Sequence, residues 1–189
     1  MRPSRSLSIV LLAVAVTAGG CATRRDHTVL LKGIPTKNLL LEPKNTRAPQ
    51  LNLTVPVDFD ADWTRDAAYD SFIIINPDDD GDVQRGILVI NVTSSPVEHI
   101  ADTLETSHTR STIAGETVEW RERTFIDEEK YVIHQRETIR TGMFKNFKDP
   151  KTGRELVLQV FVVGTDTALV GQLQGAAETI VAGGGRPAA

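Results

Sequence analysis

The side chains best suited to catalysis or metal binding are scattered through this sequence of 189 residues. Its four histidines are residues 27, 99, 108 and 134. No second histidine or cysteine stands three or four positions from any of them, and no HExxH segment occurs. The sequence contains no nucleophile elbow and no glycine-rich phosphate loop. We therefore expect a protein that is not an enzyme, with no catalytic residues, no cofactor and no metal.

The densest acidic run, residues 76–82, is the best candidate for a cation site. The residues that match the first half of an EF-hand calcium loop are Asn76, Asp78, Asp80 and Gly81. The twelfth position of such a loop would be Ile87 instead of a bidentate glutamate. Because Asp and Gly are also favoured in turns, we predict an acidic turn here. The paired carboxylates of Asp58 and Asp60 are likewise interpreted as solvated turn charges.

The segment from Met143 to Arg154 combines aromatic and basic side chains in an otherwise acidic chain of formal net charge −4. Its candidate partner-binding residues are Phe144, Lys145, Phe147, Lys148, Lys151 and Arg154. Exposed apolar groups beside positive charge suit a membrane surface or an acidic partner. The alternative is that both phenylalanines cover the core edge and the lysines only keep a hairpin soluble. A companion hypothesis adds Arg121, Arg123, His134 and Arg136 to form one anion-receptive face.

The thiol of Cys21 is the remaining reactive group, and it is the only cysteine in the chain. Two arginines and the apolar run 7–18 precede it. That run is about half the ~20 residues that a membrane-spanning helix needs, and it is typical of a signal-peptide core. The small residues Ala18, Gly19 and Gly20 then lead directly into Cys21. Such residues let a peptidase approach an extended backbone whose cysteine has accepted a diacylglyceryl group.

This arrangement resembles the lipobox of bacterial lipoproteins, with Ala18 at the position where leucine is commonest. The resemblance implies that residues 1–20 are a lipoprotein signal peptide and that Cys21 attaches the chain to a membrane. The protein would then lie on the periplasmic side of the bacterial cell envelope. By resemblance to enterobacterial sorting, Ala22 points to the outer rather than the inner membrane. The alternative is an ordinary secretory signal peptide that leaves a free thiol.

Residues 21–50 are rich in Lys, Arg and Pro, and we predict a tether there, with Leu39–Leu41 able to dock as a short edge strand. A single α+β domain is expected over residues 51–182, followed by a loose tail over 183–189. Alternating or continuous apolar residues predict strands at 51–55, 71–75, 86–93, 116–126, 131–141 and 155–163.

Two helices complete the expected domain. Ser95-Pro-Val-Glu98 is a capping-box pattern and predicts a helix that continues to about residue 108. Asp166 or Thr165 is expected to cap a second helix, which glycines 183–185 end. The hairpin of 116–126 with 131–141, built on a turn at residues 128 and 129, places Arg121 opposite Arg136. The expected fold class is α+β, an antiparallel sheet of about six strands with two packed helices.

The order of these elements, from a strand that ends in Pro56 near Trp63 to a C-terminal helix, resembles the PsbP-like fold. It is most similar to bacterial lipoproteins of the DcrB and LpqN kinds, especially over 68–73 and 87–90. The resemblance implies a non-catalytic scaffold or protein-binding role with an envelope protein as partner and no nucleic acid. The alternative is an accessory protein that binds a small ligand or lipid between sheet and helix. These families share no catalytic motif, so no functional residue is carried over.

Overall fold

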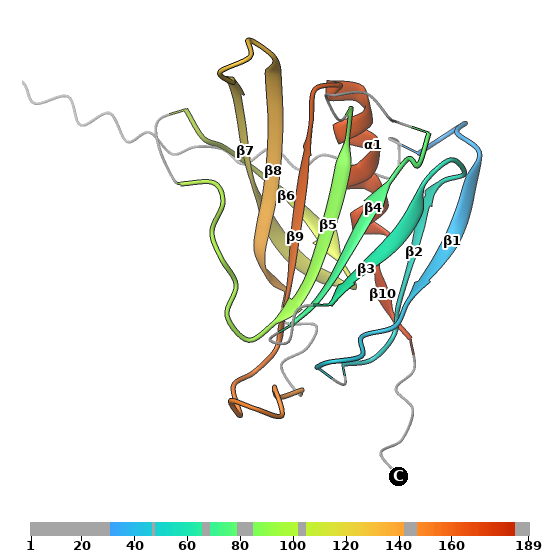
Figure 1. The fold of residues 1–189 in the computed structure, drawn as a ribbon, viewed down its shortest axis with the longest axis vertical. Helices are drawn as coiled ribbons and strands as arrows, with labels where there is room; N and C mark the ends of the chain where they lie inside the picture. The colour runs from blue at the N-terminus through green and yellow to red at the C-terminus, as the bar shows by residue number, and fades with distance from the viewer. Residues whose placement is uncertain are drawn as a thin grey trace, which may run out of the picture.

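The structure is a computed structural model, and it describes residues 31–46, 48–65, 69–78, 85–101, 105–141 and 147–183. The fold is α+β and is dominated by antiparallel sheets (Figure 1). The elements are β1 (Thr36–Leu41), β2 (Leu51–Pro56), β3 (Asp60–Arg65), β4 (Asp70–Ile75), β5 (Ile87–Thr93), β6 (Ser107–Ile113), β7 (Glu116–Ile126), β8 (Val132–Thr141), β9 (Val157–Gly164), α1 (Thr167–Glu178) and β10 (Val181–Ala182).

Seven strands form the large sheet in the order β3-β4-β5-β9-β8-β7-β6, and a small sheet has the order β1-β2-β10. Helix α1 packs against β5, β6, β8 and β9 of the large sheet and against β2 of the small one. Strand side chains alternate between the two faces of a sheet. On β9, residues 158, 160 and 162 are therefore buried beneath α1, whereas residues 161 and 163 face the opposite side and are half-buried.

The final helix is present as expected. The Asp166 carboxylate caps it by accepting hydrogen bonds from the backbone N–H groups of Ala168 and Leu169, at 3.0 and 3.1 Å. Such a cap satisfies N–H groups that have no partner within the helix. The chain does not end at the helix, however, because β10 follows and pairs with β2. Leu39–Leu41 also docks as expected, as part of β1. The folded part begins before the expected boundary at residue 51, because β1 pairs with β2 along its length and Ala48 belongs to the core.

The helix expected after Ser95 is wrong, and α1 is the one helix among the described residues. Residues 95–101 form an irregular segment, and β6 begins at Ser107. The buried carboxylate of Glu137 accepts hydrogen bonds from the backbone N–H groups of His99 and Ile100, at 2.9–3.2 Å. Gln159 bonds to both the N–H and the C=O of Val97. Side chains of the sheet thus satisfy the backbone groups that a helix would pair internally.

The expected count of about six strands is also too low, since the described residues form ten. The predicted β7–β8 pairing is wrong by one residue, because Arg121 lies opposite Glu137 and Arg136 lies opposite Glu122. The turn spans residues 127–130, and Lys130 adopts a positive φ of 69°. A shift of one residue moves every side chain to the other face of a strand. It also replaces the expected pair of like charges with two pairs of opposite charge.

The antiparallel pairing gives the molecule two distinct ends. The entry end holds residues 31–35, where the described chain begins, and the β7–β8 turn at residues 127–130. The pairings Thr36 with Pro56, Asp60 with Ile75, Ile87 with Val163 and Gly164 with His134 connect these two places along one edge of the fold. The far end holds residues 42–46 and 148–155. Figure 1 shows the entry end at the top and the far end at the bottom.

Candidate functional site

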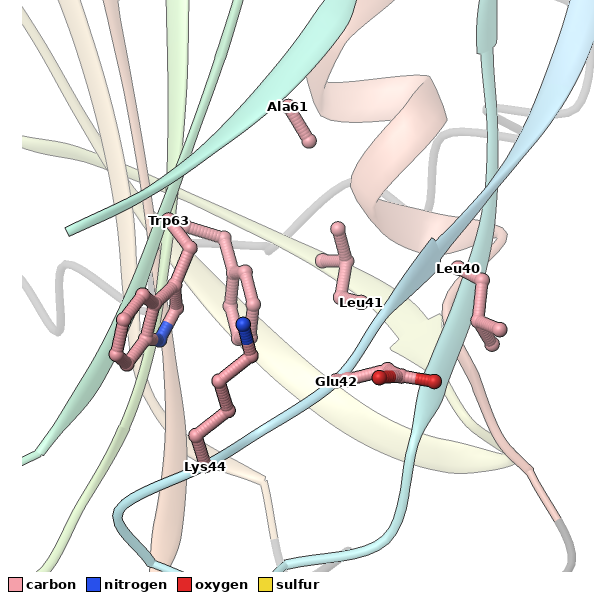
Figure 2. Close-up of a pocket in the computed structure, with 7 residues that line it drawn as sticks. Leu40, Leu41, Glu42, Lys44, Ala61 and Trp63 are labelled. Carbon is pink, nitrogen blue, oxygen red and sulfur yellow. The ribbon is translucent and has the colours of Figure 1, made fainter. Parts of the chain in front are cut away.

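An open groove of about 320 Å³ lies between the small sheet and the edge of the large sheet. Its walls are residues Leu40, Leu41, Glu42, Lys44, Ala61, Trp63 and Phe72. Trp63 and Lys44 stand on one side of the groove and Leu40, Leu41 and Glu42 on the other (Figure 2). The volume is at the lower end of the range of about 300–1,000 Å³ that small-molecule sites occupy.

The aromatic wall of the groove is held by pairing within the sheet. Trp63 of β3 lies directly opposite Phe72 of β4, so the two rings project from the same face. Phe72 and Leu41 are almost fully buried, whereas Leu40 is 54% exposed. The groove therefore has an apolar floor and an open apolar rim.

The buried carboxylate of Asp70 fixes one end of this wall. It accepts hydrogen bonds from the indole N–H of Trp63 at 3.2 Å and from the backbone N–H groups of Lys44, Asn45 and Thr46 at 2.7–3.2 Å. Burial alone would raise the pKa of Asp70. The hydrogen bonds from the Thr46 hydroxyl and from these backbone groups outweigh burial and hold the pKa below its ordinary value. Asp70 stays ionised and acts as a structural anchor for the Trp63 ring and for residues 44–46.

Two groups of opposite charge stand at the groove mouth. The Lys44 ammonium lies 4.8 Å from the centre of the Trp63 ring, a cation–π distance. Lys44 and Glu42 are both exposed. The groove can therefore bind an apolar or aromatic group on its floor while a polar or charged end meets Lys44 or Glu42. Sequence reasoning missed this site because its residues come from three segments, which are brought together by the pairing of β3 with β4 and the packing of β1 beside β3.

The basic segment 143–154, here named the basic loop, is exposed only in part. Phe147 packs against the hydrophobic core, as the alternative interpretation proposed, while Lys148, Lys151 and Arg154 are exposed. The N–H of Lys151 and the hydroxyls of Thr152 and Ser94 hold the pKa of Asp149 down at about 2. These bonds fix a tight turn at the far end of the molecule. Phe144 and Lys145 lie outside the described residues.

The prediction that Arg121, Arg123 and Arg136 share one face is wrong. Arg121 and Arg123 lie on the face of the large sheet away from α1, where Arg121 bonds to Glu98 at 3.2 Å. Arg136 lies on the other face, under α1, where it pairs with Glu122 at 3.8 Å and donates to Gln174. His134 shares the face of Arg136. The shift in β7–β8 register separates these cations, so they form no single anion-receptive surface.

A buried polar cluster extends from Arg136 along the underside of α1. Gln174 donates to Glu178 at 3.3 Å, and the indole N–H of the buried Trp120 lies 3.1 Å from the same carboxylate. Burial raises the pKa of Glu178 to about 7, although hydrogen bonds from Ser111, Gln174 and Trp120 and the charge of Arg136 favour the ionised form. This cluster holds α1 on the sheet.

The other candidates of the sequence contribute little to this site. Among the described residues, no group of three or more His, Cys, Asp or Glu side chains is arranged to hold a metal ion. In the acidic run, the Asn76 side chain accepts from the N–H of Asp78 at 2.9 Å, as in a turn, and residues 79–84 lie outside the described part. Ala18, Gly19, Gly20 and Cys21 lie outside it too. Within the part that the structure describes, no helix has the length and apolar character to cross a bilayer.

The groove and the fold define an α+β protein with an open site, lined by apolar and charged side chains, between two antiparallel sheets. Comparison of the chain with protein-family models, with curated proteins and with solved structures finds no match.

Proposed function

We propose that the protein is a lipid-anchored, non-catalytic binding protein of the bacterial cell envelope, with the groove at Trp63 as its binding site. The lipobox-like residues 18–21 support the anchor. The single observation that carries the binding role is the preformed aromatic wall of Trp63 and Phe72, with Lys44 above it. The ligand class that suits this groove is a small amphipathic molecule, with its apolar part on the floor.

The hydrogen bonds that the buried carboxylates make within the fold support a non-catalytic role. Asp70 and Glu137 each use their carboxylate oxygens to hold backbone N–H groups of a neighbouring segment. Glu178 contacts Trp120 and Gln174 beneath α1. All three carboxylates thus hold parts of the fold together, Asp70 beside the groove and Glu137 and Glu178 away from it.

Assignment to the PsbP-like fold, in the form found in the DcrB and LpqN kinds of lipoprotein, is part of the proposal. It is supported by the order of β2 to β5, the antiparallel β7-β8-β9 succession and the C-terminal helix α1. The groove supports the alternative that the protein binds a small ligand, although the groove lies between two sheets rather than between sheet and helix.

A second candidate function, binding of an acidic envelope protein, rests on the exposed cations Lys148, Lys151 and Arg154. They lie at the far end, opposite the entry end where the described chain begins at residue 31 (Figure 1). From that position they would face away from the anchoring membrane and toward partners in the periplasm.

Binding in the groove is tested by titrating the full chain with dodecanoate below its micelle concentration while recording tryptophan fluorescence. We expect a saturable change, because Trp63 lines the groove. Ala61→Phe would fill the groove and weaken dodecanoate binding at least tenfold. Ala182→Phe, at an exposed alanine of β10, is the matched control and should bind as the wild type does. Equal binding by the two variants, or no saturable change in the wild type, would refute the groove as the site.

A further inference from the structure

The β7–β8 hairpin extends beyond both of its neighbours in the large sheet. Pairing of β7 with β6 ends at Glu122, opposite Ser107. Pairing of β8 with β9 ends at His134, opposite Gly164. Residues 125–133, here named the hairpin tip, therefore pair in the sheet only with each other, and Figure 1 shows them projecting at the top of the molecule.

The hairpin tip is apolar on both faces. Ile126 and Val132 form a cross-strand pair on one face and are 69% and 46% exposed. Phe125 and Ile133 form a half-buried pair on the other face, and Tyr131 is 43% exposed. Among the described residues, three of the seven large hydrophobic side chains that are exposed belong to this one tip. Such a concentration marks an interaction site more often than a single exposed side chain does.

The hairpin tip lies at the end of the molecule where the described chain begins, and this position indicates which surface the tip can contact. Only nine residues separate Cys21 from Leu31 in the sequence. A chain of that length reaches at most about 35 Å when fully extended. Residues 31–35, which lead into β1, and the hairpin tip lie at the same end of the molecule (Figure 1). A lipid on Cys21 therefore keeps Leu31 within about 35 Å of its anchor point in the bilayer, so the tip at the same end is within reach of the membrane surface.

We propose that the hairpin tip docks in the interface of the lipid bilayer that holds the Cys21 anchor. This inference rests on the proposed lipid attachment. Ile126 and Val132 enter the boundary between headgroups and acyl chains, and the Tyr131 ring lies at headgroup level, where aromatic side chains are enriched. Val57, 45% exposed in the β2–β3 turn, is a separate apolar side chain at the same end. Tethering raises the local concentration of the tip at the surface, so weak docking is sufficient.

The charges of the turn define the lipids that suit this docking. Asp127, Glu128 and Glu129 outnumber Lys130, so the tip carries net negative charge. Asp127 is engaged within the turn, because its carboxylate accepts from the N–H of Tyr131 at 2.7 Å. The hairpin docks with its Ile126–Val132 face against the bilayer, so that the exposed Glu128 and Glu129 remain among the headgroups. Docking is therefore favoured by zwitterionic headgroups and weakened by anionic ones.

Docking at this end also fixes the orientation of the other surfaces. The exposed cations of residues 148–154 lie at the far end and point away from the bilayer. Lys44 and Glu42 at the groove mouth also belong to the far end. A ligand or partner would then approach from the aqueous periplasm rather than from the anchoring membrane.

The test places a nitroxide label at the tip of the acylated mature protein in phosphatidylcholine vesicles. Ile126→Cys carries the label, since Cys21 is blocked by its lipid and no other cysteine exists. Val181→Cys is the matched control, because Val181 is 53% exposed on β10, whose Ala182 pairs with Leu51 near the far end. Accessibility to oxygen and to a water-soluble nickel complex reports the depth of each label. We expect the label at position 126 to gain oxygen and lose nickel accessibility at least threefold relative to position 181.

Each outcome decides between the two proposals. Equal, water-like accessibility at both positions in vesicle-bound protein overturns bilayer docking while leaving the anchor intact. Protein that does not stay with the vesicles, or that lacks a lipid on Cys21, refutes the anchor itself. A label at position 126 that becomes buried only in native membranes, and not in pure lipid, overturns bilayer docking in favour of a protein partner. Replacing a third of the lipid with phosphatidylglycerol should reduce the difference between the two positions, and an unchanged or larger difference would contradict the role assigned to the acidic turn.

Discussion

Replacing Glu178 by glutamine should make the protein more stable at alkaline pH and leave it unchanged at acidic pH. Burial raises the pKa of this carboxyl from 4.5 to about 7. Such a change is worth at most about 3 kcal/mol, since each tenfold change in proton affinity corresponds to about 1.36 kcal/mol. Glu178 is partly exposed, and water screens its charge, so we expect about 2 kcal/mol.

The sign follows from the direction of the pKa change. The folded protein holds the Glu178 proton more tightly than the unfolded chain does, so protonation favours folding. This contribution is full below pH 4.5 and is lost as the pH rises to about 7. Glutamine imitates the protonated carboxyl at every pH and keeps hydrogen-bonding groups beside Trp120 and Gln174. The wild type should therefore match Glu178→Gln at pH 4.5 and be less stable by about 2 kcal/mol at pH 8.

Urea unfolding of both proteins between pH 4.5 and 8, followed by circular dichroism, measures this difference. Glu128→Gln is the matched control, because Glu128 is an exposed carboxylate of the β7–β8 turn. Its difference from the wild type should stay within about 0.5 kcal/mol across the range. A difference between wild type and Glu178→Gln that is the same at pH 4.5 and pH 8 would refute the reasoning. It would mean that Glu178 does not titrate in this interval.

Three further predictions concern the groove, the basic loop and the anchor. Asp70→Ala would leave the N–H groups that bind this carboxylate unsatisfied, so it should lower the free energy of unfolding by about 3 kcal/mol. The control Asp62→Ala removes an exposed carboxylate and should lower it by less than about 0.5 kcal/mol. Equal losses in urea unfolding would contradict the structural role of Asp70. Replacing Lys148 and Lys151 together by Glu should abolish any acidic partner crosslinked in native membranes, and unchanged recovery would remove the loop from consideration. Cys21→Ser should accumulate as precursor without palmitate label, whereas undiminished labelling would place the lipid elsewhere.

Local patterns were sufficient to predict the strands at the centre of the sheet and the last helix. The apolar runs of β5 and β9 are long and nearly continuous, with Asn91 and Gln159 as the polar residues inside them. Asp166 begins α1 at one of the two positions that the sequence indicates. The residues that determine these elements lie close together in the sequence, so a single sequence contains the information that predicts them.

Elements whose backbone partners are distant in sequence could not be predicted. The capping-box pattern at Ser95 is a valid local signal for a helix, yet Glu137, 38 positions after His99, binds the backbone there instead. The β7–β8 register depends on the positive φ of Lys130, a residue with no special tendency toward that conformation. Because the observed register differs from the predicted one by one residue, Arg136 lies beneath α1 instead of on the outer face of the sheet.

The groove illustrates the same limit for a functional site. Leu41, Trp63 and Phe72 are each ordinary apolar residues of predicted or edge strands. Only the packing of β1 beside β3 and the pairing of β3 with β4 make them one surface. The signal that was present in the sequence is the pair of Trp63 and Asp70, seven positions apart, which are joined by the indole hydrogen bond.

The lipid on Cys21 is the central claim, because both the envelope role and the bilayer docking depend on it. Intact-mass spectrometry of the mature protein purified from membranes tests it most directly. We predict a chain that begins at Cys21 and carries a diacylglyceryl group, with or without a further acyl chain on its amino terminus. A mature chain with an unmodified thiol, or a chain that still begins at Met1, would contradict the account.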